Sequence, residues 1–244
     1  HHEHRRQRQM CIRDRCLNNK NISNLDYITL TASGGPFLNT PLDQFKNIKP
    51  RDAINHPIWK MGQKISVDSA TMINKALEII EASVLFNLNS NQIDVVVHPE
   101  HIVHGLVHYK DGSTIANLGL PDMITPISVA LNWPNRLDLN LTKMSLTKIG
   151  KLSFFEPDLK KFPGLKLGWE ALKSPYCSPI VLNASNEIAV DFFLKNKIQF
   201  TDIFNIVEDT LNFYNPVKPQ NIDDVIETDK IARKYALKII DKVK

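Results

Sequence analysis

The stretch VDSATMINKALEIIE, from Val67 to Glu81, is typical of an amphipathic helix, but its polar side is unusual. At 100° per residue, the polar arc collects Thr71, Asn74, Lys75, Glu78 and Glu81. The opposite arc collects Ile73, Leu77, Ile80 and Val84. We therefore expect the apolar arc to face a core, and the pattern predicts a helix with Asp68 or Ser69 as its N-cap.

The polar arc allows two interpretations. A serine at a helix N-terminus would attract an anion through unpaired N–H groups and the helix dipole, and Lys75 and Asn74 would add a charge and an amide donor. Glu78, three residues after Lys75, suits a divalent cation better than a phosphate. The alternative is a solvated face with an ion pair between Lys75 and Glu78, and this stretch alone leaves both interpretations open.

Composition and charge exclude several classes of protein. The chain has 244 residues, of which 43% are hydrophobic and 23% charged, as in a soluble globular protein of one large or two modest domains. No apolar run approaches the ~20 residues of a membrane span. Residues 1–15 hold five arginines and two acids, which leaves 25 of the 30 basic and 24 of the 26 acidic residues for the remainder. The formal charge of +4 therefore does not indicate nucleic-acid binding, and we expect residues 1–15 to be a non-native or disordered tail.

Local patterns predict an α+β fold of the α/β family type, with a mixed-sheet catalytic domain followed by an all-α helical bundle. Expected strands are 27–31, 93–97 and a hairpin of 101–109 and 114–118 around Asp111-Gly112. Expected helices or turns are 42–47, 121–134, 165–172, 184–196, 200–213 and 228–243. The corresponding division is a catalytic domain at 16–140, a linker with short strands at 141–163 and a helical domain at 164–244.

Histidines and cysteines give only a weak metal signal. Four histidines lie close together in the sequence: His98, His101, His104 and His108. Their spacing would suit a metal on a helix, but the turn at Asp111-Gly112 predicts a strand, so a four-histidine metal site is the minor interpretation. Cys11, Cys16 and Cys177 form no paired framework and no metal spacing, which favours a reducing, cytoplasmic setting.

Two loops could also contact a ligand. Ser33-Gly34-Gly35 follows the first expected strand and either cradles an anion with backbone N–H groups or forms a plain tight turn. Trp59 and Met61 lie in a short polar loop. They belong either to a core or to a flap that closes over a ligand, and composition does not decide between these.

Five blocks of sequence together resemble one known family. They are SGGPF at 33–37, HPIWKMGQKISVDSATMINKALEIIEA at 56–82, LPDMITPI at 120–127, WPNR at 133–136 and LNASNEIAV at 182–190. The family is 1-deoxy-D-xylulose 5-phosphate reductoisomerase, the NADPH- and divalent-metal-dependent enzyme of the non-mevalonate isoprenoid pathway. The long block is the most specific, because nearly every position matches in register. The resemblance runs from about Cys16 to near the C-terminus.

The resemblance implies a role for each matching residue. The substrate phosphate would be bound by Ser33, His56, Ser69, Asn74 and Lys75. Further contacts to the substrate would come from Glu78, as a ligand of Mg²⁺ or Mn²⁺, and from Trp59 and Met61 on a mobile covering loop. Gly62 and Met123 would approach NADPH, and the catalytic residues would be His56, Lys75 and Glu78.

The implied activity is the rearrangement and NADPH-dependent reduction of 1-deoxy-D-xylulose 5-phosphate to 2-C-methyl-D-erythritol 4-phosphate. Loop closure would exclude water while the rearranged aldehyde is reduced, and the phosphate clamp would hold the reacting end in register. The family also implies a cytoplasmic homodimer that uses a phosphorylated sugar and binds neither nucleic acid nor membrane.

One part of the family pattern has no counterpart here. The glycine-rich NADPH-binding loop and the Asp-Ser-Glu motif, which carries the other two metal carboxylates, would lie upstream of the match. Residues 1–15 occupy that place and do not resemble them. We therefore expect a fragment that is inactive alone. The alternative is a non-catalytic sugar-phosphate-binding or assembly module that keeps only the anion pocket.

Overall fold

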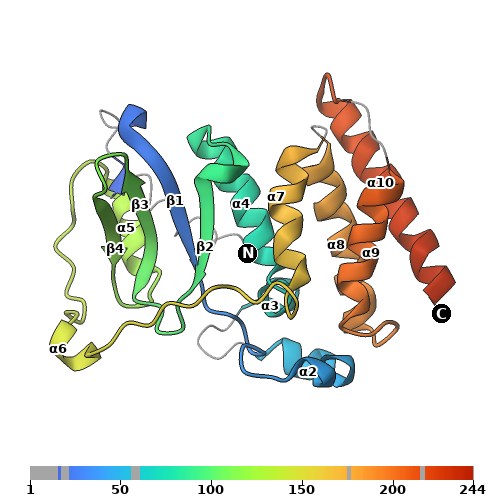
Figure 1. Ribbon diagram of the computed structural model, residues 1–244, viewed down its shortest axis with the longest axis horizontal. Helices are drawn as coiled ribbons and strands as arrows, with labels where there is room; N and C mark the ends of the chain where they lie inside the picture. Colours follow the sequence, from blue (N-terminus) through green and yellow to red (C-terminus); the bar gives the residue numbers. More distant parts are fainter. Residues whose placement is uncertain (1–15, 18–21, 56–60, 175–176, 215–217, 244) are drawn as a thin grey trace. The chain divides into compact units, whose positions relative to one another are not determined.

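The protein folds as two compact units, each assembled from two separate segments. The computed structural model describes residues 16–17, 22–55, 61–174, 177–214 and 218–243 (Figure 1). The first unit, here called the sheet unit, comprises His1–Ser33 and Leu85–Pro157. The second, the helical unit, comprises Gly34–Val84 and Asp158–Lys244. The sequential division into a catalytic domain, a linker and a helical domain stays a prediction.

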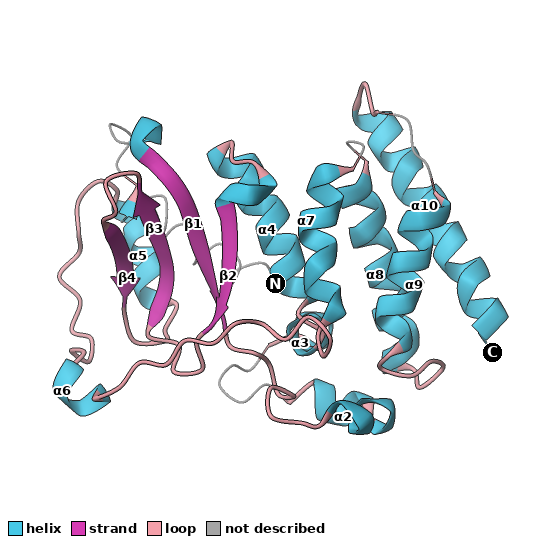
Figure 2. Ribbon diagram, viewed as in Figure 1, coloured by secondary structure: helices cyan, strands magenta, loops and turns pink. Residues whose placement is uncertain are grey.

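The sheet unit is built on a mixed sheet, which confirms the predicted fold class. Its strands are β1 (Leu25–Ala32), β2 (Ile93–Val97), β3 (Val103–Tyr109) and β4 (Thr114–Leu118). In the order β2-β1-β3-β4, β1 is parallel to β2 and antiparallel to β3, and β3 is antiparallel to β4 (Figure 2). The predicted hairpin turns where Gly112 adopts φ +84° and the Asp111 carboxylate accepts the N–H of Ser113 at 2.8 Å.

Short helices complete the sheet unit. They are η2 (Ile22–Asn24), η4 (Ser90–Gln92), α5 (Ile124–Asn132) and α6 (Leu146–Ile149). Helix α5 begins later than the expected residue 121, because the Asp122 carboxylate accepts the N–H of Thr125 at 2.9 Å and so caps its first turn. In place of the short strands expected in 141–163, the described chain forms α6 and a single bridge between Val97 and Phe155.

The helical unit contains the predicted C-terminal helices. Its elements are η3 (Leu42–Asn47), α2 (Pro50–Ala53), α3 (Gln63–Ala70), most of α4 (Ile73–Phe86), η5 (Pro163–Leu165), α7 (Lys166–Lys173), α8 (Ser178–Leu194), α9 (Asp202–Phe213) and α10 (Ile222–Val243). Helices α8, α9 and α10 pack on one another. Helix α8 starts before the expected residue 184, because Pro179 is tolerated in a first helical turn. Helix α10 starts before residue 228, because the Asn221 side chain caps it by accepting the N–H of Asp224 at 2.9 Å.

The predicted single helix over 67–81 is wrong, because the chain forms two helices joined by Thr71 and Met72. Met72 has φ +59°, in the left-handed region, and this conformation ends α3 and re-aims the chain into α4. Asp68 and Ser69 therefore lie inside α3 and are not N-caps. Val84, expected in the core, lies in the last turn of α4 and is 75% exposed.

Two glycines hold the start of α4 by direct backbone contact. A Cβ on Gly168 of α7 would lie 2.7 Å from the carbonyl oxygen of Ala76, and one on Gly164 would lie 2.7 Å from Cγ1 of Ile73. Neither distance leaves room for a side chain, so η5 and α7 rest closely on the first two turns of α4. Among the described helices, none combines the length and apolar character needed to cross a membrane.

Candidate phosphate-binding site

Buried charge is concentrated in α3 and α4. Among the described Asp, Glu, Lys and Arg residues, the buried ones are Asp68, Lys75 and Glu78, which are 0%, 3% and 1% exposed. Taking a charge out of water costs several kcal/mol unless it is well paired, so three such groups in two consecutive helices indicate a role beyond stability. The solvated-face interpretation of the polar arc is wrong: the ion pair between Lys75 and Glu78 forms, but inside the protein.

Glu78 is held by both polar side chains of the first turn of α4. Its Oε1 accepts a hydrogen bond from Asn74 Nδ2 at 2.6 Å, and its Oε2 lies 2.6 Å from Lys75 Nζ. Spacings of four and three residues place these donors and the carboxylate on one helix face. Both contacts are short, as expected for hydrogen bonds to an ionised acceptor.

The turn between α3 and α4 places the buried residues Thr71, Met72 and Ile73 at the amino end of α4, next to these donors in the sequence. The Thr71 hydroxyl donates to two carbonyl oxygens of α3, at 3.1 and 3.2 Å. Its Oγ1 also accepts a hydrogen bond from the backbone N–H of Ile73 at 3.4 Å. Thr71, and not the predicted Asp68 or Ser69, therefore accepts the first N–H of α4. A helix N-terminus with an amide and an ammonium on its first turn is suited to binding an oxyanion.

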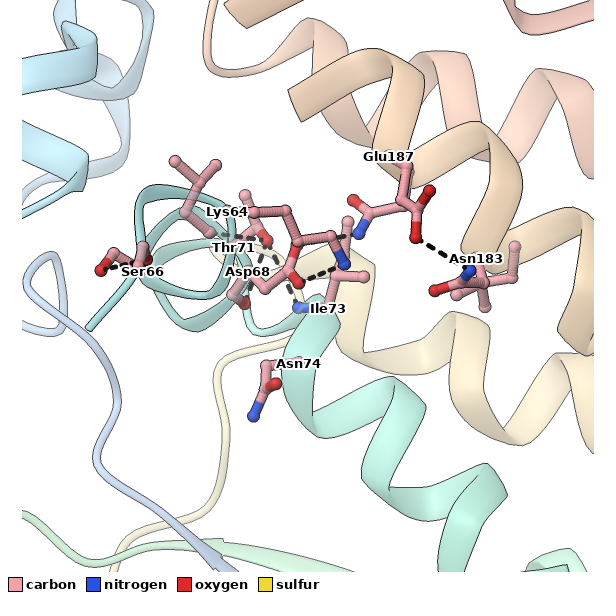
Figure 3. A network of polar contacts seen from close by, with 12 residues as sticks. Lys64, Ser66, Asp68, Thr71, Ile73, Asn74, Asn183 and Glu187 are labelled. Carbon is pink, nitrogen blue, oxygen red and sulfur yellow. Dashed lines mark hydrogen bonds and ion pairs between the residues drawn. The ribbon is translucent and has the colours of Figure 1, made fainter. Parts of the chain in front are cut away.

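Asp68 joins α3 to α8 within the helical unit (Figure 3). Its Oδ1 accepts a hydrogen bond from Asn186 Nδ2 at 2.8 Å, and its Oδ2 lies 2.6 Å from Lys64 Nζ. Asp68 and Asn186 are fully buried, and the Lys64 side chain is 36% exposed. Because Asp68 directly precedes Ser69, these bonds fix the last turn of α3, from which Ser69 projects.

A second set of polar contacts joins α8 to α10. Asn183 Nδ2 donates to Glu187 Oε1 at 3.2 Å, and Arg233 Nη2 donates to Glu187 Oε2 at 2.6 Å (Figure 3 shows the first contact). Arg233 also bonds Asp229 at 2.7 Å, and this bond, with the Glu187 contact, raises the pKa of the guanidinium. Sequence reasoning did not assign Asn183, Asn186 or Glu187. The signal was available: several amide and acid side chains in an otherwise apolar helix need buried partners.

The loops next to α3 carry further predicted residues. Ser69 is half-buried in α3, and a Cβ on Gly35 would lie 2.7 Å from its carbonyl oxygen. Gly35 has φ +67°, so the glycine permits both the conformation and the close approach. Met61 and Gly62 directly precede α3, where the Gly62 carbonyl accepts two hydrogen bonds from Ser66 at 3.1 Å.

Other predicted site residues are placed elsewhere or lie outside the described residues. Ser33 follows β1 and Met123 precedes α5, and both belong to the sheet unit. His56 and Trp59 fall in the undescribed stretch 56–60. The roles that the family resemblance gives these four residues stay predictions.

The clustered histidines have separate hydrogen-bond partners. His98 and His104 bond carbonyl oxygens at 2.8 and 3.1 Å, and His108 bonds the hydroxyl oxygen of Thr29 at 2.8 Å. Within the described ranges, no three His, Cys, Asp or Glu side chains gather as they would around a metal ion. A four-histidine metal site is therefore wrong for this structure.

Glu78 fits a divalent cation as one ligand of a larger set. Its carboxylate is the oxygen donor that Mg²⁺ and Mn²⁺ prefer, and it lies beside the candidate anion site. The described part of the chain brings no two further ligands to it. The arrangement can therefore hold an oxyanion with Asn74 and Lys75 and offer a single carboxylate to a metal whose other ligands come from elsewhere.

Two family models match the chain. The model of the DXP reductoisomerase C-terminal domain matches residues 118–235, which include α8 and most of α10. The model of the 1-deoxy-D-xylulose 5-phosphate reductoisomerase C-terminal domain matches residues 8–86, which include α3 and α4.

Individual relatives agree with these models. The chain is 48% identical over 229 residues to the 1-deoxy-D-xylulose 5-phosphate reductoisomerase of Ehrlichia canis (strain Jake), covering 93% of this chain and 59% of the relative. It is 50% identical over 218 residues to that of Ruthia magnifica subsp. Calyptogena magnifica, covering 89% and 57%. The chain therefore spans less than two thirds of the curated relatives that it matches.

Solved structures give the same result. The reductoisomerase from Zymomonas mobilis in complex with NADPH superposes with a TM-score of 0.89 at 41% identity, covering 96% of this chain and 60% of that one. A DOX-P reductoisomerase in complex with NADPH, fosmidomycin and magnesium superposes with a TM-score of 0.83 at 42% identity, covering 92% and 57%.

Proposed function

The chain belongs to the 1-deoxy-D-xylulose 5-phosphate reductoisomerase family, and we propose that its protein is the NADPH-dependent oxidoreductase and isomerase that makes 2-C-methyl-D-erythritol 4-phosphate. The observation that carries this proposal is the hydrogen-bonded cluster of Asn74, Lys75 and Glu78 at the amino end of α4, in which Lys75 and Glu78 are buried. An ammonium and an amide at a helix N-terminus suit a sugar phosphate, and the adjoining carboxylate suits a divalent metal.

Each predicted site residue has a proposed role. Asn74 and Lys75 donate to the substrate phosphate, with Ser69, Ser33 and His56 as further donors. Glu78 gives one carboxylate to Mg²⁺ or Mn²⁺. Trp59 and Met61 cover the substrate, and Gly62 and Met123 contact NADPH.

The contribution of this chain is chiefly positioning. With the phosphate held at α4, the reacting carbons are fixed relative to Glu78, and this fixed geometry lowers the entropic part of the barrier. A divalent metal would supply Lewis-acid polarisation of the substrate carbonyl, and NADPH would supply the hydride. The covering loop would exclude water during the reaction.

Turnover by this chain alone is not expected. No three metal-ligating side chains gather among its described residues, and the relatives that it matches are much longer. An NADPH-oxidation assay with 1-deoxy-D-xylulose 5-phosphate should therefore show no activity for the 244-residue chain. Activity should appear in a protein that adds the glycine-rich and Asp-Ser-Glu segments of the family. We further propose a cytoplasmic homodimer; size-exclusion chromatography with light scattering tests its mass.

The rival proposal is a non-catalytic sugar-phosphate-binding module, which is favoured because no group of three metal-ligating side chains forms among the described residues. Calorimetric titration with 1-deoxy-D-xylulose 5-phosphate, with and without Mg²⁺, separates the two. Binding that Mg²⁺ strengthens supports the reductoisomerase site, and binding that ignores Mg²⁺ supports the module. If the dephosphorylated sugar binds as tightly as the sugar phosphate, both proposals fail.

A further inference from the structure

Glu78 is bonded to the same two side chains that the proposed function assigns to the phosphate. Asn74 Nδ2 and Lys75 Nζ each lie 2.6 Å from one of its oxygens, so both ends of the carboxylate are engaged. The three side chains are also close neighbours on one helix face, and Lys75 and Glu78 are buried. Both donors are therefore already bonded to Glu78 before any phosphate binds.

A phosphate at the start of α4 would compete with this carboxylate. The ammonium has three hydrogens and the amide two, so sharing is possible by hydrogen-bond count. Sharing, however, would bring a phosphate and a carboxylate, both negative, onto the same donors in a poorly solvated place, where like charges repel strongly. Exchange of one anion for the other avoids that repulsion.

We propose that Glu78 is an internal competitor of the substrate phosphate. Without a phosphate it holds Lys75 and Asn74, and phosphate binding requires these donors to leave Glu78. The inference rests on the proposed function, since it needs a phosphate site at the amino end of α4. It gives Glu78 a second role, as a residue that sets phosphate affinity.

The exchange couples the anion to the cation. A divalent cation that binds Glu78 releases the two donors for the phosphate, and a phosphate that withdraws the donors leaves the carboxylate oxygens for the cation. By thermodynamic linkage the two effects are equal in size. A substrate that presents a phosphate and metal-binding oxygens together would therefore be favoured over a ligand that presents only one of them.

A second lysine–glutamate pair in the helical unit provides a matched control. Lys166 Nζ lies 2.9 Å from Glu208 Oε1, and both side chains are about one-third exposed, at 38% and 33%. Glu208→Gln removes one negative charge from the same unit without touching α4. Its effect on phosphate binding therefore measures the contribution of net charge alone.

The first test compares phosphate affinity in the complete 244-residue chain. Inorganic phosphate is titrated by calorimetry into the wild type, Glu78→Gln and Glu208→Gln, with a chelator present to remove divalent cations. Gln keeps the size of Glu but removes the charge and leaves one acceptor oxygen for two donors. We expect Glu78→Gln to bind phosphate at least about tenfold more tightly than the wild type, which is about 1.4 kcal/mol, and Glu208→Gln to change affinity less than about twofold.

Equal or weaker phosphate binding by Glu78→Gln overturns the inference but leaves the proposed phosphate site standing. If none of the three proteins binds phosphate, both the inference and the proposed function fail.

The second test uses only the wild type, so it stands even if Glu78→Gln does not fold. The side-chain carboxyl ¹³C resonances are followed by NMR as inorganic phosphate is added. Loss of two hydrogen-bond donors should move the Glu78 resonance while the Glu208 resonance stays in place. A Glu78 resonance that does not move at saturating phosphate overturns the inference.

Discussion

The α3–α4 segment and the C-terminal helices of the helical unit differ in how deeply their ion pairs are buried. In α3 and α4, the charged groups Asp68, Lys75 and Glu78 are buried. In the C-terminal helices, Arg233 and Lys195 meet their carboxylate partners with at least 30% of each side chain exposed. Exposed ion pairs lose little hydration when they form and contribute little stability. Buried ion pairs lose much more hydration, so a segment with a purely structural role gains little from them. The contrast indicates that a ligand-binding site should be sought in the α3–α4 segment, where the charged side chains are buried.

Lys75→Met should have the largest effect of the changes considered. It removes the one ammonium at the start of α4, and a hydrogen bond to a charged group contributes about 1.5–3 kcal/mol, so affinity for 1-deoxy-D-xylulose 5-phosphate should fall about 100-fold. Calorimetric titration measures it. Lys166→Met is the control, because Lys166 belongs to a partly exposed ion pair. It should leave the affinity within about twofold of the wild-type value. Similar losses in both variants would erase the distinction between the two regions.

Asn186→Leu tests the buried contact between α8 and α3. The change leaves Oδ1 of Asp68 without its 2.8 Å donor in a fully buried place, so the free energy of unfolding should fall by about 2 kcal/mol. Urea unfolding followed by circular dichroism measures this loss. Phosphate affinity should fall as well, because Asp68 fixes the turn that leads to Ser69. A variant as stable as the wild type would show that the contact does not hold α3.

Arg233→Met tests the corresponding contact between α8 and α10. Its partners Glu187 and Asp229 are partly exposed and can be solvated after the change, so the loss should be about 0.5–1 kcal/mol. The same urea experiment measures it, and phosphate titration of the same sample should give the wild-type affinity. A loss larger than that of Asn186→Leu would reverse the ranking of the two regions.

His108 extends the comparison to the sheet unit, where a half-buried polar group has a structural role. Its ring bonds the hydroxyl oxygens of Thr29 and Thr114 at 2.8 and 2.9 Å and stacks on Tyr27 at 4.0 Å. Burial lowers the pKa of His108 below its usual value of about 6.5. As the pH falls below that value, the unfolded chain takes up the proton first, so stability is lost as the pH decreases.

His108→Gln removes this titration, and its effect should be the smallest of the four. Between pH 7.5 and 5.5 the wild type should lose slightly more unfolding free energy than the variant, as urea unfolding at each pH would show. Identical pH dependence in both proteins would mean that the pKa of His108 is the same in the folded and the unfolded chain.

Much of the sheet could be predicted because its signals are local. The β-branched run at 93–97 and the Asp111-Gly112 turn gave strands 93–97 and 114–118 with the observed bounds, whereas the strand expected at 101–109 begins at Val103. The break between α3 and α4 could not be predicted in this way. Met72 at φ +59° carries no sequence signal, since a left-handed methionine is imposed by the packing around it.

The site was predicted in part. The face shared by Asn74, Lys75 and Glu78 followed from helical spacing, although the burial of Lys75 and Glu78 did not, because burial depends on packing between segments that are far apart in sequence. The bond between Asp68 and Asn186 joins residues separated by 118 positions, and no local pattern specifies it. Long-range partners of this kind require the tertiary structure.

Whether the start of α4 holds a phosphate group can be measured directly in the ¹⁵N-labelled 244-residue chain. Backbone amide shifts are recorded during titration with 1-deoxy-D-xylulose 5-phosphate and, separately, with 1-deoxy-D-xylulose. The phosphorylated sugar should shift the amides of Asn74 and Lys75 strongly and saturably, and the dephosphorylated sugar should not. Equal shifts from both sugars, or shifts from the phosphorylated sugar that spare α4, would contradict a phosphate site at this helix.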